Sequence, residues 1–411
     1  MDFRQEGATA APLKAAHRIG PPRHLTSSDR VSAQRLLHEI AAEPGMLGPA
    51  SPRQPLVLYG GGDLGLLARE HLRTVGCDIA IVVDRNAAAL SAGTAWRGIP
   101  VLAPDDVPAT LKNEALLAVS IVTSPYSALE AALRADGWRD ILPFYDLAES
   151  FRDRHPLSNG WFAAPFEPGE LQLVADVLDG WEDDRSRAHH LQFIAWRRLR
   201  QEWMFSDAPV TIRDRFFIPE IVHCLTDSEF FVDGGAHHGS VSARFLSESR
   251  ERLSGIVAIE PDAANRGVLA DYLGGLPSET RSRIAVSDAL LDKECSNRRF
   301  HEGLGYASQL SETGNSLATT TTLDSLDLSP TFIKLHLEGA ELAALQGGAQ
   351  TIVRHRPILA LTTYHNPDGI WRTPAWLTEN LEDYRFLMRL HGWCGTGAVV
   401  YAIPKERWRN S

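Results

Sequence analysis

The stretch that most constrains the fold runs from Phe230 to Leu246 and reads FFVDGGAHHGSVSARFL. It begins as a short apolar run typical of a buried strand, passes through a glycine-rich turn, and continues with apolar residues at helical spacing. A strand, a glycine turn and a helix in this order form the entrance to a nucleotide-type pocket, because glycines let a ligand approach the backbone closely. The stretch therefore predicts an α/β fold with a ligand site at this turn.

The acid at the end of this strand narrows the choice of ligand. Asp233 stands where a dinucleotide-binding fold would place a glycine to receive a pyrophosphate. A carboxylate at that point repels phosphate and attracts an ammonium or sulfonium group. The position of Asp233 therefore favours S-adenosylmethionine (SAM) over NAD as the ligand.

The next two strands extend the pattern. A strand expected at 256–259 ends in Glu260, 27 residues after Asp233, and a carboxylate at such a tip can accept hydrogen bonds from both hydroxyls of a ribose. The run SRIAVSDAL adds a third strand, with Ser287 and Asp288 placed to meet the adenine. Later apolar patterns predict strands at 332–337, 358–362, 384–390 and 398–403. Alternating strands and helices imply a parallel sheet, and the adjacent terminal strands suggest an antiparallel hairpin at its edge.

A second glycine turn lies in the first half of the chain, in the run LVLYGGGDLG. Gly60, Gly62 and Gly65 complete a G-x-G-x-x-G, and Asp84 follows about 20 residues later, where a ribose-binding acid belongs. This small doubly wound unit resembles the Rossmann-like N-terminal domain of sugar acyltransferases and of some sugar-modifying methyltransferases. It predicts either a nucleotide or nucleotide-sugar site, or a packing domain whose glycines serve close helix–strand contact.

These patterns divide the chain into four parts. Residues 1–54 are expected to form a mobile tail, a short helix at 28–43 and a linker; residues 55–150 form the first Rossmann-like domain; residues 151–225 form a helical connector; and residues 226–411 form the ligand-binding domain.

Composition excludes several partners. The net charge of −11 argues against nucleic acid, since phosphate binding requires a basic surface. The four cysteines are scattered without disulfide or metal spacing, which suggests a reducing compartment. The N-terminus lacks the apolar core of a secretory signal, and no apolar run approaches the roughly 18 residues that span a membrane. The expected location is the cytoplasm.

Several motifs in order resemble one family. The runs VDGGAHHGS, AIEPD, RIAVSD, TTLDSL, IKLHLEGAELAALQGG and RPILALTTYH are similar to those of the FkbM-type SAM-dependent methyltransferases, over residues 215–403. The resemblance implies a Rossmann-like methyltransferase fold, with a mostly parallel seven-stranded sheet that contains one antiparallel strand. It also implies transfer of the methyl group of SAM to a hydroxyl of a sugar, glycan or secondary metabolite.

The resemblance assigns residues to the SAM pocket. The glycine turn would line the methionine end of SAM with Asp233, Gly234, Gly235, Ala236, Gly239 and Ser240. The end of the second strand would hold the ribose with Glu260, Pro261 and Asp262, and the end of the third would border the adenine with Ser287 and Asp288. The chain departs from the family at one point. The family commonly has Ile-Lys-x-Asp-x-Glu-Gly, and the position of that Asp is His336 here.

An alcohol acceptor benefits from a base near neutral pH, and histidine is the natural candidate. Reacting groups in an open α/β sheet lie beyond the carboxyl ends of the strands. We therefore expect His336 or His365 to act as the base, with Lys334 and Glu338 orienting the acceptor. The alternative is that each histidine only satisfies local hydrogen bonds. The spacing of these residues matches no standard metal-ligand pattern, so no metal is expected.

Two other functions fit parts of the sequence. The G-x-G-x-x-G of the first domain is also found in NAD-dependent oxidoreductases, although no catalytic residues adjoin it. The loss of the usual Asp at position 336 is compatible with a SAM- or nucleotide-binding module whose catalytic site has decayed. A methyltransferase of this kind would take a small-molecule or carbohydrate acceptor, either free or linked to a nucleotide. A homodimer is a further alternative.

Overall fold

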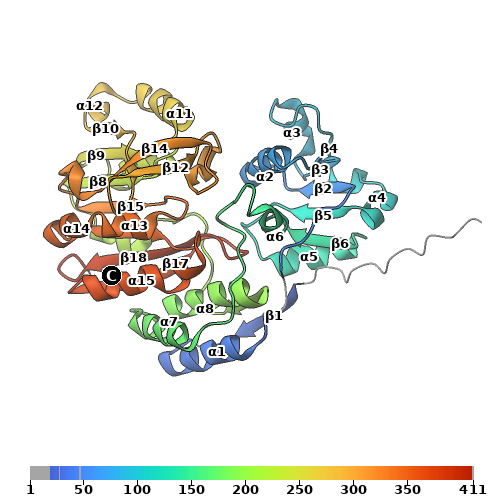
Figure 1. Ribbon diagram of the computed structural model, residues 1–411, viewed down its shortest axis with the longest axis horizontal. Helices are drawn as coiled ribbons and strands as arrows, with labels where there is room; N and C mark the ends of the chain where they lie inside the picture. Colours follow the sequence, from blue (N-terminus) through green and yellow to red (C-terminus); the bar gives the residue numbers. More distant parts are fainter. Residues whose placement is uncertain (1–18, 27, 46–47, 410–411) are drawn as a thin grey trace, which may run out of the picture.

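The computed structural model describes residues 19–26, 28–45 and 48–409. Within them the chain forms two sheet-containing units side by side, and helices from distant parts of the sequence lie along one side of the C-terminal unit (Figure 1). The N-terminal unit spans the strands between residues 56 and 143, and the C-terminal unit spans those between residues 229 and 404.

The N-terminal unit is built on a five-stranded parallel sheet of order β4-β3-β2-β5-β6. Its strands are β2 (Leu56–Tyr59), β3 (Ile81–Val83), β4 (Val101–Leu102), β5 (Leu116–Val119) and β6 (Asp140–Pro143). Its helices are α2 (Asp63–Thr74), α3 (Ala87–Ala92), α4 (Ala109–Glu114), α5 (Tyr126–Ala135) and α6 (Phe144–Ala148). The apolar runs of β2 and β5 are buried on both faces, as expected of central parallel strands.

The C-terminal unit is built on a seven-stranded sheet of order β10-β9-β8-β15-β16-β18-β17. Its strands are β8 (Glu229–Gly234), β9 (Leu253–Ile259), β10 (Ile284–Ser287), β15 (Phe332–Leu335), β16 (Ile358–Thr362), β17 (Tyr384–Leu390) and β18 (Ala398–Pro404). β18 runs opposite to both of its neighbours, and the others run parallel to one another. The expected α/β fold, with a mostly parallel seven-stranded sheet and one antiparallel strand, is confirmed.

The last hairpin closes the sheet in an order that chain order does not suggest. β18 pairs with both β16 and β17, so β17 forms the edge although it precedes β18. All seven residues of β18 are buried. An apolar strand of this kind is more stable inside the sheet than at a solvent-exposed edge.

Helices cover both faces of the C-terminal sheet. Those contributed by this part of the chain are α10 (Ser240–Glu248), α11 (Ala263–Gly274), α12 (Ser278–Arg281), α13 (Glu341–Gln346), α14 (Ala349–His355) and α15 (Arg372–Asn380). A four-stranded sheet that the sequence patterns did not predict lies beside them, formed by β11 (Leu290–Leu291), β12 (Asn297–His301), β13 (Gln309–Leu310) and β14 (Ser316–Thr321).

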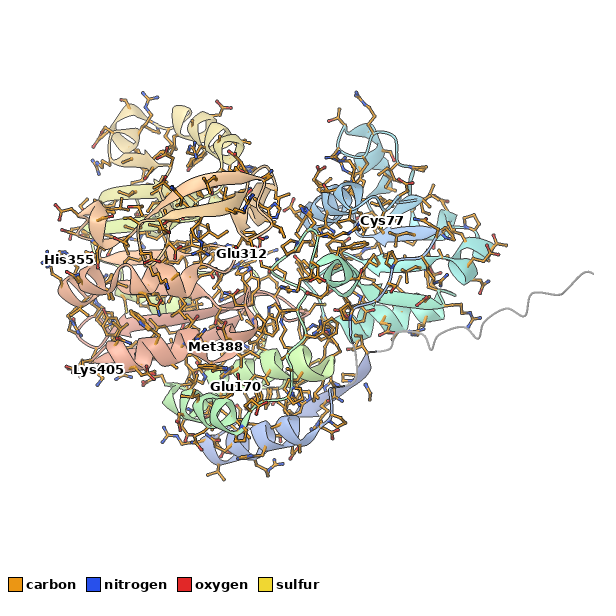
Figure 2. All side chains as sticks on the ribbon, viewed as in Figure 1. Cys77, Glu170, Glu312, His355, Met388 and Lys405 are labelled. Carbon is orange, nitrogen blue, oxygen red and sulfur yellow. The ribbon has the colours of Figure 1, made fainter. Side chains whose placement is uncertain are left out.

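The connector joins the beginning of the chain to the C-terminal unit. α1 (Arg30–Ala42) packs on α7 (Pro168–Gly180) and α8 (Asp184–Leu199), with α9 (Pro219–Cys224) further along. α8 also lies along the edge strand β17, which carries Met388 (labelled in Figure 2). The amide of Met388 donates a hydrogen bond to Ser186 Oγ (3.0 Å). The connector is therefore part of the core that supports the C-terminal sheet.

The expected mobile tail is partly wrong. Residues 1–18 lie outside the described residues, but β1 (Gly20–Leu25) pairs in parallel with β7 (Gln201–Phe205). The sequence of β1 is mostly polar and therefore gave no sign of a strand. The strand is stabilised by its backbone hydrogen bonds to β7 and by Arg23, which stacks over Trp203 at 4.4 Å. The helix that follows is capped by Asp29, and the hydroxyl of Ser28 donates a hydrogen bond to Asp184 O (2.8 Å).

Buried arginines at the end of α8 tie the two units together. Arg200 pairs with Asp146 of α6 at 3.0 Å, and both side chains are almost fully buried. Arg197 donates to backbone carbonyls of the connector and of the C-terminal unit, including Gly395 O at 2.7 Å. The four cysteines are free, and none of the helices in the described ranges has the length and apolar character needed to cross a membrane.

Candidate active site

In the turn after β8 the backbone at Gly235 lies very close to a neighbouring strand end, as the glycines of the turn suggested. Gly235 has φ +75°, and a Cβ atom added there would lie 2.0 Å from the carbonyl oxygen of His336. The amides of Gly235 and Ala236 both donate to Ile259 O at 2.9 Å. The turn thus packs against the ends of β9 and β15, which only a residue without a side chain permits at position 235.

Asp233 lies behind this turn. Its carboxylate accepts hydrogen bonds from Lys334 Nζ (2.9 Å) and Ser242 Oγ (2.7 Å), and it has no exposed surface. Lys334 also donates to the carbonyls of Gly234 and Gly235. The two residues form a buried ion pair that holds the turn. Asp233 does not line the cavity in front of the turn, whereas Lys334 does. The roles expected of the two residues remain predictions.

A cavity of about 310 Å³ opens in front of the turn. Glu260 faces it and is held by the amides of His237 (2.7 Å) and Asp262 (3.0 Å) and by the side chain of Asn265 (3.3 Å). Burial raises the pKa of the Glu260 carboxyl, and these hydrogen bonds partly offset the rise. The carboxylate is thus fixed in position at the tip of β9, where it can accept hydroxyl groups.

The other predicted pocket residues divide into two groups. Gly235, Ala236, Ser240, Glu260 and Pro261 line the cavity, whereas Asp233, Gly234, Gly239, Asp262, Ser287 and Asp288 do not. Asp262 instead caps α11 and binds the amide of Gly303. The wall expected from Ser287 and Asp288 is made by the residues just beyond them and by the additional sheet, namely Ala289, Leu290, Leu291 and Phe300.

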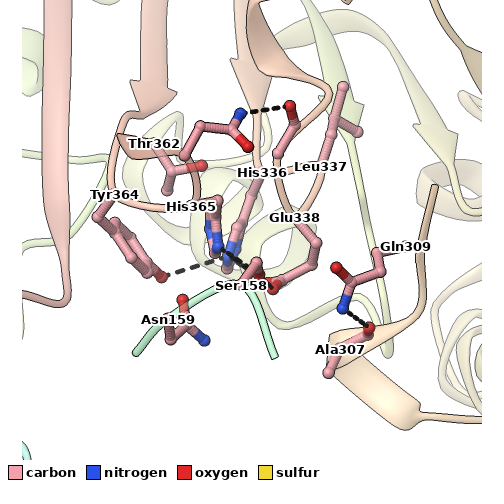
Figure 3. Close-up of polar contacts among 12 residues, drawn as sticks. Ser158, Asn159, Ala307, Gln309, His336, Leu337, Glu338, Thr362, Tyr364 and His365 are labelled. Atoms are coloured by element: carbon pink, nitrogen blue, oxygen red, sulfur yellow. Dashed lines mark hydrogen bonds and ion pairs between the residues drawn. The ribbon is translucent and has the colours of Figure 1, made fainter. Parts of the chain in front are cut away.

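The ends of β15 and β16 bring three predicted residues together. His336 Nε2 lies 3.0 Å from Glu338 Oε1, and His365 Nδ1 lies 3.3 Å from Glu338 Oε2 (Figure 3). The side chain of His336 is 20% exposed, whereas those of His365 and Glu338 are buried. Burial raises the pKa of Glu338 to about 8 and lowers the pKa of both imidazoles well below the usual value, so neutral forms are favoured.

The loop that carries this cluster is organised by a second glutamate. Glu341 accepts hydrogen bonds from the amides of Leu337 (2.9 Å) and Gly339 (3.0 Å) and from Thr362 Oγ1 (2.7 Å). Between them, Glu338 adopts φ +50°, which is costly for a residue with a side chain. The loop is held in this conformation from several sides, and the result is that the Glu338 carboxylate points toward both histidines.

A larger cavity, of about 920 Å³, lies between the two units. The N-terminal unit contributes Gly60, Gly62 and Asp84 to its lining, while Gly65 packs against the Gly60 carbonyl. Asp84 accepts the amides of Gly61 and Asn86, both at 2.7 Å. Glu338 lines both this cavity and the smaller one. The two cavities therefore meet at the histidine–glutamate cluster.

Residues 233–392 match the family model described as the methyltransferase FkbM domain. This region is an FkbM methyltransferase domain. The fold is also similar to the crystal structure of methyltransferase FkbM from Methylobacillus flagellatus KT, with a TM-score of 0.60, 19% identity, and 90% of this chain and 98% of that chain covered.

Two further solved structures share less. One is the precorrin-6y C5,15-methyltransferase from Geobacter metallireducens GS-15, with a TM-score of 0.29, 14% identity, and 48% of this chain and 93% of that chain covered. The other is the methyltransferase domain of a bacterial Hen1, with a TM-score of 0.26, 12% identity, and 43% of this chain and 91% of that chain covered. No curated protein matches the chain.

Three residues around the histidine–glutamate cluster were not predicted from the sequence. Ser158 of the connector donates to Glu338 Oε2 (2.7 Å) and contacts His365 Nδ1 (3.0 Å). Tyr364 Oη lies 3.4 Å from His336 Nε2 and accepts a hydrogen bond from Arg215 (2.8 Å). Tyr364 adjoins a predicted histidine and could have been suspected, but nothing in the sequence near Ser158 or Arg215 indicates that the connector reaches this site.

Proposed function

We propose that the protein is a SAM-dependent O-methyltransferase that acts on a hydroxyl of a carbohydrate or secondary metabolite. The observation that carries this proposal is the meeting of the two cavities at Glu338, beside His336. A methyl donor in the smaller cavity and an acceptor in the larger one would then face each other across the cluster. Such positioning supplies much of the rate enhancement in group transfer.

The smaller cavity suits SAM in its chemistry. Glu260 offers a fixed carboxylate to a ribose, and the apolar wall of Leu290, Leu291 and Phe300 suits a flat aromatic base. When bound, SAM supplies an electrophilic methyl group on a sulfonium. The glycine turn at Gly235 allows close approach of the ligand to the backbone.

The larger cavity suits an acceptor of considerable size. Its walls come from both units, and the glycine turn at Gly60 and Gly62 lies on the side opposite His237 and Glu338. A nucleotide-linked sugar would fit this arrangement, with its nucleotide part toward the N-terminal unit and its sugar toward the cluster. The N-terminal unit is thus proposed to bind part of the acceptor.

His336 is proposed as the group that receives the hydroxyl proton. Its side chain is partly exposed and lines the smaller cavity, whereas His365 is fully buried and lines neither. In this proposal Glu338, which contacts both imidazoles, positions His336, and Ser158 positions Glu338. Lys334 supports the reaction indirectly, through the glycine turn.

Calorimetric titration with SAM, with NAD and a nucleotide sugar as parallel titrants, tests the proposal. We expect the wild type to bind SAM. The affinity of Glu260→Ala for SAM should be lower by about tenfold or more, because the substitution removes a hydrogen-bond acceptor for the ribose. The matched control is Glu279→Ala, an exposed glutamate away from the cavity, which should bind SAM as the wild type does. Binding of NAD without any binding of SAM would overturn the proposal and move the site to Gly60 and Gly62.

A further inference from the structure

We propose that His336, Glu338 and His365 form a binding site for a divalent transition metal of the zinc class. One potential ligand atom from each residue lies within 4.8 Å of the others. Two imidazoles and one carboxylate are a donor set that proteins use for such ions, and the set leaves coordination positions open for other ligands. Sequence spacing concealed it, because the ligands come from the loops after two adjacent strands.

The distances fit ligands that share one ion. Metal bonds of about 2.0–2.2 Å at tetrahedral or octahedral angles place neighbouring ligand atoms roughly 3 to 3.5 Å apart. The carboxylate oxygens of Glu338 lie 3.0 Å from His336 Nε2 and 3.3 Å from His365 Nδ1. The left-handed backbone at Glu338 is the feature that turns its carboxylate between the two rings. Small side-chain movements would therefore complete the coordination.

The second nitrogen of His365 supports this assignment. Nε2 is buried and has no hydrogen-bond partner among the described residues, and Glu341 Oε1 lies 3.8 Å from it. If Nδ1 carries the hydrogen, the Nε2 lone pair faces a carboxylate, which is unfavourable. An ion on Nδ1 requires the hydrogen on Nε2, which then points toward Glu341. Carboxylates in this outer position are the usual partners of metal-bound histidines.

The surrounding charges also allow a cation. The nearest buried lysine, Lys334, is neutralised by Asp233 at 2.9 Å. Glu338 and Glu341 place two carboxyl groups around the histidines, which balance the guanidinium groups of Arg215 and Arg197 that act on His365. Imidazole ligands favour zinc, cobalt, nickel or iron over magnesium, which prefers oxygen ligands and retains water.

This inference rests on the proposed function in one respect, which is the role of the ion. The cluster lies where the two cavities meet, so open coordination positions would face an acceptor hydroxyl. A ligated imidazole cannot take up a proton. In the metal-bound protein the ion would stabilise the deprotonated acceptor oxygen, and the proton would pass to water in the larger cavity. His336 would then be a ligand rather than the base.

The test is direct metal binding to the full-length protein, purified without a histidine tag and stripped with a chelator. We expect Co²⁺ to bind with one ion per chain, to give the visible absorption of a nitrogen- and oxygen-ligated site, and to be displaced by Zn²⁺ but not by Mg²⁺. His336→Asn and Glu338→Gln should each weaken binding by about tenfold or more. Thermal unfolding would verify that both variants fold.

His238→Asn is the matched control, since His238 lines the larger cavity but lies outside the cluster. It should bind Co²⁺ as the wild type does. Absence of stoichiometric binding, equal binding in all variants, or displacement by Mg²⁺ as readily as by Zn²⁺ would overturn the inference. A SAM titration on the same samples separates the two proposals: SAM binding without metal binding rejects the metal site alone, and metal binding without SAM binding rejects the proposed function alone.

Discussion

At the scale of single residues, the buried pair of Asp233 and Lys334 makes a direct prediction about stability. Their side chains are 0% and 1% exposed, and removing one partner of such a pair leaves an uncompensated buried charge. We expect Lys334→Met to lower the free energy of unfolding by about 3–5 kcal/mol, measured by urea denaturation.

The matched control for this prediction is Lys405→Met. Lys405 pairs with Asp383 at 3.0 Å, but the two side chains are 57% and 72% exposed. Solvent screens this pair, so the change should stay within about 1 kcal/mol. Equal effects of the two substitutions would show that burial of the first pair does not matter.

The pH dependence of SAM binding follows from Glu260. Burial raises the pKa of its carboxyl, and a ribose needs the ionised form as acceptor. Affinity should therefore be full above this pKa and fall as the pH drops through it, by up to about tenfold per pH unit. Of the groups that face Glu260, burial lowers the pKa of His237 to about 4 and hydrogen bonds lower the pKa of Asp262, while Arg266 donates to the backbone oxygen of Glu260.

Titration by calorimetry between pH ~8 and ~5 measures this dependence, with Glu260→Gln as the control. The amide cannot ionise, so its weaker SAM binding should not vary over this range. A wild-type affinity that is equally flat would remove Glu260 from the SAM site.

At the scale of elements, the β8–α10 turn depends on one glycine. Gly235→Ala would place a Cβ atom 2.0 Å from His336 O and force a left-handed backbone, which costs about 1–2 kcal/mol before any clash is counted. We expect lower thermal stability and loss of SAM binding. Gly267→Ala in α11 is the control, because a Cβ atom there meets nothing within 4 Å and alanine favours a helix by about 1 kcal/mol; it should be as stable as the wild type or more so.

At the scale of the whole molecule, the proposed acceptor site requires both units. Gly62 lines the larger cavity and has open space around it. We expect Gly62→Leu to raise the KM for the acceptor by roughly tenfold, because it fills part of the cavity, and to leave the Kd for SAM unchanged. Gly169→Leu, also in open space but outside both cavities, should change neither value. An unaltered KM in Gly62→Leu would separate the N-terminal unit from acceptor binding.

The buried arginines hold the two units together beside that cavity. Arg200 and Arg197 connect the end of α8 to α6 and to the loop before β18. The sequence showed them only as basic residues in an amphipathic helix. Their role depends on carbonyls and a carboxylate from segments up to about 200 residues away, which no local pattern contains.

The sequence by itself determined the alternation of strands and helices, because backbone periodicity and apolar burial are local. The strands predicted at 358–362 and 384–390 agree with β16 and β17 to the residue, and the glycine turn and Glu260 lie where their pattern indicated. Only the tertiary structure decided which side chains line the cavities. Pairing of β15 with β8 brings Lys334 to Asp233, whose carboxylate lies outside the cavity that Lys334 lines. Pairing of β15 with β16 and the return of the connector join His336, Glu338, His365 and Ser158. Such partners are selected by contacts between distant segments, and sequence spacing does not record them.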